Sequence, residues 1–90
     1  PFLYGVGLRD INVESPIHGS VAGVLVISVE EDSNAWHAGL APGDVIISAN
    51  QQKTVDIPSL KKIVMNTKQD LLLNVLRQSG AVFLVVNKEQ

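Results

Sequence analysis

The sequence has no cysteine and few aromatic residues, and both shortages exclude classes of protein. Without cysteine, the chain forms neither disulfides nor thiolate metal sites. The aromatic residues are Phe2, Tyr4, Trp36 and Phe83, too few for the stacking platforms that bind unpaired bases. The seven Lys and Arg residues are scattered and outnumbered by nine Asp and Glu, so we expect no nucleic-acid partner.

Long apolar runs and catalytic constellations are also missing. No run approaches the roughly 18 residues needed to span a membrane. The only histidines, His18 and His37, have no metal-binding spacing, and we interpret both as solvated surface residues. A hydrolytic triad needs a histidine within reach of a hydroxyl and an acid, and no such set is recognisable. We therefore predict no enzyme activity, no metal and no cofactor for the chain itself.

The 90 residues predict one small domain with a single modest core. Because the chain starts at Pro1 without a methionine or signal segment, we expect a piece of a longer protein. Apolar runs bounded by turn residues predict strands, at 4–11, 24–30, 44–50, 71–77 and 81–87. The strand 24–30 is almost continuously apolar, which predicts cover on both faces.

Two helices and two further connections complete the expected order. Ser33 is a suitable N-cap and Gly39 a suitable stop for a short helix. A longer helix is predicted over 56–67, with Pro58 in its first turn. Its apolar stripe comprises Leu60, Ile63, Val64 and Thr67. Residues 12–23 are predicted to form a turn-rich loop, and residues 78–80 a three-residue hairpin loop with a left-handed glycine.

These elements predict a mostly β (α+β) fold with two helices. Five or six short strands are expected to close as a small sandwich or partial barrel, with the longer helix against one opening. So little helix cannot cover every strand edge. We therefore expect a groove between an exposed strand edge and the longer helix.

The stretch HAGLAPGDVIISAN, residues 37–50, contains two glycines and one aspartate. A phosphate loop requires glycines that lead into a helix, whereas Gly39 and Gly43 lead into a strand. We therefore expect the Asp44 carboxylate to accept hydrogen bonds from nearby backbone amides and order the turn. Trp36 is either packed on the core or offered to a partner, and we favour packing.

The segment SNAWHAGLAPGDVIISANQQ resembles the signature segment of PDZ domains from the bacterial Deg/HtrA periplasmic serine proteases. The helix IPSLKKIV, the strand LLLNVLR and the closing hairpin follow in that family's order, so the resemblance covers nearly the whole chain. Asn34 stands where proline is usual. The resemblance implies a circularly permuted, protease-type PDZ domain over residues 1–90, most like the C-terminal second PDZ domain of a periplasmic protease.

The resemblance also implies a peptide-binding role, in which the C-terminal end of an unfolded protein adds as a strand at an edge. The family's carboxylate-binding loop matches LYGV, which is Leu3, Tyr4, Gly5 and Val6. Val6, Gly7 and Leu8 are expected to pair with the peptide backbone. Val6 and Leu8 are expected to point alternately, one of them into the pocket for the terminal side chain. The helix is expected to contribute Val64 and, one turn earlier, Lys61, which is otherwise a plain solvated helix residue. An apolar last residue is expected in the ligand.

Two functions remain open at this stage. The domain either recruits peptides for an attached serine protease, or it holds neighbouring protease and PDZ domains together in a homo-oligomeric cage. Gly7 weakens the pairing strand, and the segment 12–23 and Trp36 offer surface to a neighbouring subunit. By family resemblance, the location is periplasmic.

Overall fold

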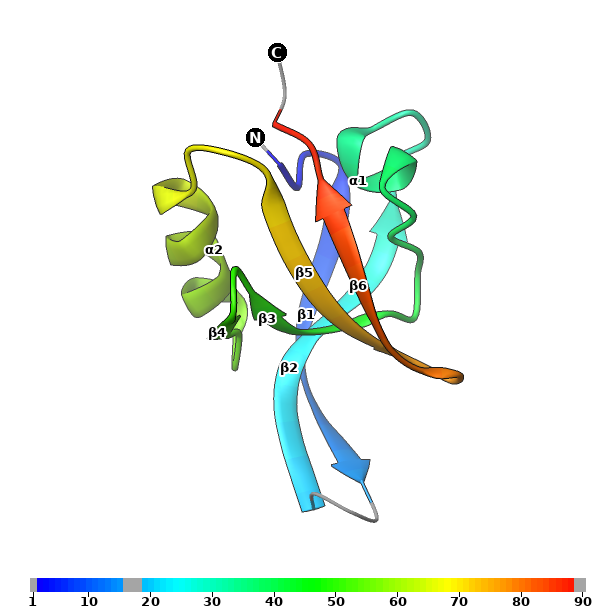
Figure 1. Cartoon of the computed structure of the whole chain (residues 1–90). Coiled ribbons are helices and arrows are strands. Elements are labelled where there is room, and N and C mark those ends of the chain that lie inside the picture. Colours follow the sequence, from blue (N-terminus) through cyan, green and yellow to red (C-terminus); the bar gives the residue numbers. More distant parts are fainter. Residues whose placement is uncertain (1, 16–18, 89–90) are drawn as a thin grey trace.

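The computed structural model describes residues 2–15 and 19–88, along which eight elements follow one another (Figure 1). In chain order they are β1 (Val6–Ser15), β2 (Gly19–Val29), α1 (Asn34–His37), β3 (Val45–Ala49), β4 (Gln52–Lys53), α2 (Ile57–Asn66), β5 (Leu71–Arg77) and β6 (Gly80–Val86). The predicted class, mostly β with two helices of unequal length, is confirmed.

The strands form one open antiparallel sheet. Its order is β1-β2-β3-β5-β6, and the short β4 pairs with β3 outside this path. β1 and β6 are therefore the two edge strands of the described sheet. The connection from β3 to β5 carries β4 and α2, and Figure 1 shows α2 standing beside the sheet.

The core lies between one face of the sheet and the apolar face of α2. Its largest fully buried side chains are Val24, Val26, Ile46, Leu60, Leu71, Leu73, Val75, Val86 and Thr54. On α2, Leu60 and Ile63 are buried, and Val64 packs against the core while partly exposed. The predicted apolar stripe thus directs α2 onto the sheet.

The start of α2 is determined by local hydrogen bonds. The Asp56 carboxylate accepts from the Ser59 amide at 2.9 Å, and the Ser59 hydroxyl lies 3.2 Å from the Asp56 amide, which donates to it. This reciprocal capping box satisfies amides that have no partner within the helix. The Ile57 amide donates to Asp10 Oδ1 at 2.7 Å, which ties the first turn of α2 to β1.

Residues 12–15 and 19–23 belong to the paired strands β1 and β2, and the prediction of a loop there is wrong. β1 and β2 stay in register from Leu8 opposite Val26 to Ser15 opposite Gly19. Figure 1 shows this ribbon as an arm that extends away from the rest of the molecule. Asn12 and Ser20 are exposed, and polar residues are compatible with strands whose faces are solvated. His18 lies outside the described residues.

Two expectations about burial are also wrong. β2 is not covered on both faces, because α2 packs on one face only, and Ile27 is 51% exposed. Trp36 is 43% exposed, with its ring edge-on to His37 at 5.1 Å between centroids. Its neighbour Ala35 is the buried residue of α1, so the short helix turns Trp36 away from the core.

The remaining turns follow the predicted chemistry with one difference in length. Ser33 caps α1 by accepting from the Trp36 amide at 3.1 Å, and Asn34, which replaces the usual proline, donates to the Asn87 carbonyl at 3.0 Å. Gly80 has the expected positive φ, +118°. It pairs with Arg77, so the β5–β6 loop proper contains two residues, not three.

Candidate peptide-binding groove

An apolar groove of about 300 Å³ lies between the N-terminal part of β1 and α2. It is lined by Leu3, Tyr4, Val6, Leu8, Leu60, Lys61, Val64 and Met65. One wall comes from residues 3–8, which include the start of the edge strand β1. The other comes from α2, more than 50 residues later in the chain. Lys61 is the single charged residue in the lining, so the groove is apolar with one cation at its rim.

One end of the groove is formed by the turn of residues 2–5. Phe2 is buried and anchors the turn to the core. The Val6 amide donates to the Leu3 carbonyl at 3.2 Å, and the Glu30 amide donates to the Gly5 carbonyl at 2.8 Å. Gly5 has φ +79°, and a Cβ there would lie 2.7 Å from the Cβ of Glu30. Only glycine fits this position without strain.

β1 leaves one of its edges open beside α2. It pairs with β2 alone, and the open edge presents backbone N–H and C=O groups to an incoming strand. The bond from the Ile57 amide to Asp10 holds α2 against β1 beyond the groove. The β1–β2 ladder has a register shift between Gly7 and Leu8, in the part of β1 that lines the groove.

The structure brings together six of the eight residues predicted for this site. Leu3, Tyr4, Val6, Leu8, Lys61 and Val64 line the groove, while Gly5 and Gly7 lie in the same segment without lining it. Val6 and Leu8 both line the groove, which corrects the expectation that only one does, because residues two apart in a strand share a face.

Sequence reasoning missed two lining residues, Leu60 and Met65. Leu60 precedes Val64 by one helical turn, so the periodicity of α2 already indicated its position. Met65 is 84% exposed. It lines the groove because the fold places α2 opposite Tyr4, and this tertiary placement could not be predicted from the sequence.

The Gly-Asp turn has a structural role, as predicted. Asp44 is 4% exposed, and its Oδ2 accepts from the Ala41 amide at 3.0 Å. The sequence did not indicate that Arg77 of β5 also holds this carboxylate, with Nε at 2.8 Å from Oδ1 and Nη2 at 2.9 Å from Oδ2. The hydrogen bond to Asp44 raises the pKa of Arg77 above its ordinary value, so the guanidinium stays protonated.

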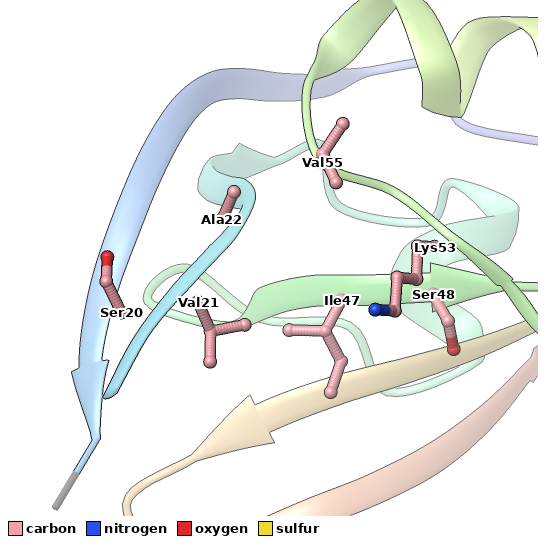
Figure 2. A pocket seen from close by; sticks show the side chains of 7 residues that line it. All are labelled: Ser20, Val21, Ala22, Ile47, Ser48, Lys53 and Val55. Carbon is pink, nitrogen blue, oxygen red and sulfur yellow. The ribbon is translucent and has the colours of Figure 1, made fainter. Parts of the chain in front are cut away.

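A second hollow, of about 470 Å³, lies on another part of the molecule (Figure 2). It is lined by Ser20, Val21, Ala22, Ile47, Ser48, Lys53 and Val55. Three of its seven lining residues, Ser20, Val21 and Ala22, come from the arm. Because that segment was predicted to be a loop, the hollow was not predictable from the sequence.

Other chemistry is sparse in the described part of the chain. His37 is exposed, and its Nε2 lies 3.8 Å from Asp32. Within residues 2–15 and 19–88, no three His, Cys, Asp or Glu side chains gather as a metal site. None of the described helices has the length and apolarity to cross a bilayer.

The molecule is a small domain of strands and helices. An apolar groove lies between an open strand edge and a helix, and a glycine turn closes one end of this groove. A family model described as PDZ domain matches residues 25–77. The chain belongs to the PDZ domain family, and the module is non-catalytic in character.

The similar curated proteins are periplasmic serine proteases. The chain is 41% identical over 68 residues to the periplasmic serine endoprotease DegP of Salmonella typhimurium, covering 76% of the chain and 14% of that protein. It is 35% identical over 66 residues to a probable DegP-like endoprotease of Chlamydia trachomatis, covering 73% and 13%. The chain therefore spans about one seventh of the length of these relatives.

Solved structures have the same fold. The crystal structure of the HtrA3 PDZ domain bound to a phage-derived ligand (FGRWV) has a TM-score of 0.70 and 23% identity, covering 94% of this chain and 89% of that one. The HtrA-type protease AlgW with a decapeptide has a TM-score of 0.72 and 28% identity, covering 92% and 27%. The predicted PDZ-like fold is confirmed.

Proposed function

We propose that the chain is a peptide-binding module that captures C-terminal ends of unfolded substrate proteins by strand addition beside β1. The observation that carries this proposal is the open edge of β1 next to the apolar groove under α2. An extended peptide adds to such an edge through main-chain hydrogen bonds, and its alternate side chains enter the groove. The proposed site residues are Leu3, Tyr4, Gly5, Val6, Gly7, Leu8, Lys61 and Val64.

The turn of residues 3–6 is the proposed seat of the terminal carboxylate. Its positive φ at Gly5 turns successive backbone groups in the manner of an anion-binding nest. The Val6 amide already donates to Leu3, so the Gly5 amide is the proposed donor. The apolar lining favours an apolar last residue, and the ligand FGRWV of the HtrA3 PDZ domain, which ends in valine, supports this preference.

The proposed setting is the periplasm, where the domain serves an attached serine protease as its second, C-terminal PDZ domain. The names of the similar proteins, which are periplasmic serine endoproteases, support this setting. The short share of those proteins that the chain covers supports a module within a longer protease chain.

The test is an NMR titration of the 90-residue chain with short peptides that end in valine, as free acids and as amides. Amides of residues 3–9 and of α2 should shift with the free acid, and amidation should weaken binding about tenfold or more because a charge-assisted hydrogen bond is lost. Absence of shifts at millimolar free-acid peptide would overturn the proposal.

Two adjacent lysines of α2 provide a matched pair of variants. Lys61 lines the groove, whereas Lys62 lies on another face beside Ser59 and Asn66. Lys61→Glu should weaken free-acid peptides several-fold through charge repulsion, and Lys62→Glu, with the same change in net charge, should stay within about twofold. Equal effects of both variants would mean that Lys61 does not face the peptide.

The assembly function remains a second candidate, and the β6 edge favours it. β6 pairs with β5 alone, and Phe83 and Val85 on it are 65% and 51% exposed. An apolar edge strand is a surface that other protein chains cover. Phe83→Ser in the full-length protease should then reduce the particle size in light scattering without changing peptide affinity.

A further inference from the structure

β2 is paired along only part of one of its edges. On one side it pairs with β1 from Gly19 to Val29. On the other side, its pairing with β3 is restricted to Val24 opposite Ile46 and Leu25 opposite Val45. Within the described sheet, the part of β2 before Val24 therefore has a neighbouring strand on one side only.

The direction of the open backbone groups follows from the bonds next to them. The Val26 amide donates to the Asp44 carbonyl, and the Val26 carbonyl accepts from the Gly43 amide, both at 2.8 Å. Backbone groups of residues two apart in a strand point to the same side. Ala22 and Ser20 therefore direct their N–H and C=O groups to the side that β3 occupies at Val24 and Val26.

β3 leaves this side because it turns toward β4. A register irregularity lies between Ile46 and Ser48, after which Ser48 pairs with Lys53 of β4. The buried Thr54 holds this turn, with its hydroxyl donating to the Ile46 carbonyl at 2.9 Å and its amide donating to the Ile47 carbonyl at 3.1 Å. The space beside Ala22 is thus bounded by β3 and β4, whose backbone is held in place by these hydrogen bonds.

The second hollow lies in this space. Figure 2 shows side chains from the arm, from β3 and from the segment after β4 around it. Val21, Ala22, Ile47 and Val55 make most of its lining apolar, and Val55 is 48% exposed. The lining contains one charge, Lys53, and neither ion pair formed between described residues involves Lys53.

We infer that this hollow is a second strand-addition site, which takes an extended polypeptide segment with apolar residues and an acidic side chain opposite Lys53. Ser20 and Ala22 offer the main-chain hydrogen bonds, the apolar lining takes alternate side chains, and Lys53 selects the charge. The site requires no terminal carboxylate. It is thus separate from the groove beside β1 and goes beyond the proposed function.

The test uses peptides of about eight residues that alternate threonine and valine, with a central glutamate and both ends blocked. Blocked ends remove the carboxylate that the β1 groove is proposed to bind. In an NMR titration of the 90-residue chain, amides of Ser20, Ala22 and Val55 should shift. Replacing the glutamate by glutamine should weaken binding several-fold, and replacing it by lysine should weaken it further.

Two variants separate the backbone and charge contributions. Ala22→Pro removes the open-side N–H and no bond to β1, so it should weaken the blocked peptide at least tenfold. Its response to free-acid peptides at residues 3–9 should match that of the parent chain. Lys53→Glu should reverse the preference, so that the lysine peptide binds more tightly than the glutamate peptide.

The inference is overturned by absence of binding at millimolar blocked peptide, or by shifts at residues 3–9 without shifts at Ser20 and Ala22. Failure of Lys53→Glu to reverse the charge preference also overturns it, and this test holds even where Ala22→Pro does not fold. Because the peptides lack a terminal carboxylate, these outcomes are independent of whether free-acid peptides bind beside β1.

Discussion

At the residue scale, the buried Asp44 carboxylate connects the signature turn to the neighbouring strand β5. Asp44 and Arg77 are 33 residues apart, and Arg77 also donates to the Gly39 carbonyl. The guanidinium thus holds both ends of the turn that precedes β3. Burial of an unpaired carboxylate is costly, so Arg77 stabilises this turn together with its local hydrogen bonds.

Arg77→Ala should destabilise the chain by about 2 kcal/mol, because it leaves Asp44 buried with the Ala41 amide as its remaining partner. The effect should be smaller than for a fully buried pair, since the Arg77 side chain is 30% exposed. Urea unfolding measures the change. The double variant Asp44→Asn/Arg77→Ala should lose less than the sum of the single changes, and simple additivity would contradict the coupling.

At the element scale, the arm and α2 determine where the sheet is open. α2 lies against the sheet through Leu60 and Ile63 and is tied to β1 by Asp10, which leaves the groove between them. The arm extends β2 beyond the point where β3 leaves it. Each of the two hollows thus lies beside a strand edge that lacks a neighbour within the described sheet.

Hydrogen exchange should distinguish the two parts of β2. Amides of Val24 and Val26 should be protected, because β3 and the turn before it accept their hydrogen bonds, while Ser20 and Ala22, which face the same side, should exchange rapidly. Val21 and Gly23, directed at β1, serve as the internal control and should exchange more slowly than Ala22. Protection of Ala22 equal to that of Val24 would contradict an open edge.

At the scale of the whole molecule, the buried apolar side chains of the described residues, apart from Val45, belong to one cluster. It joins β2, β3, α2, β5 and β6 with the turn at Phe2. The arm lies outside this cluster, and the long dimension of the molecule, 41 Å against 25 Å and 19 Å, reflects it. One core predicts one cooperative unit.

Calorimetry should therefore show a single transition whose calorimetric and van't Hoff enthalpies agree, with a heat-capacity increment of about 1.2 kcal/mol/K for a chain of this size. The same midpoint should follow from far-UV circular dichroism. A separate early transition in the far-UV signal would mean that the arm melts independently of the core.

The site was predictable in part because its residues are encoded by local patterns. The resemblance of LYGV to the family's carboxylate-binding loop, and of the helix IPSLKKIV to the family's helix, led to six of the lining residues. Met65 and Arg77 were not predictable, because their partners come from other elements. The arm was not predictable because residues 12–23 are rich in turn-forming types. Backbone pairing between β1 and β2 nevertheless holds residues 12–15 and 19–23 in strands.

The sequence by itself determined the Gly-Asp turn, the cap of α1, most strand segments and the family, because each depends on residues within a few positions of one another. Only the tertiary structure decided which strand edges stay unpaired, that Trp36 faces outward, and that a second hollow exists beside Ala22. Those properties depend on where β3 leaves β2 and where α2 packs, and such long-range pairings are set by the whole sheet.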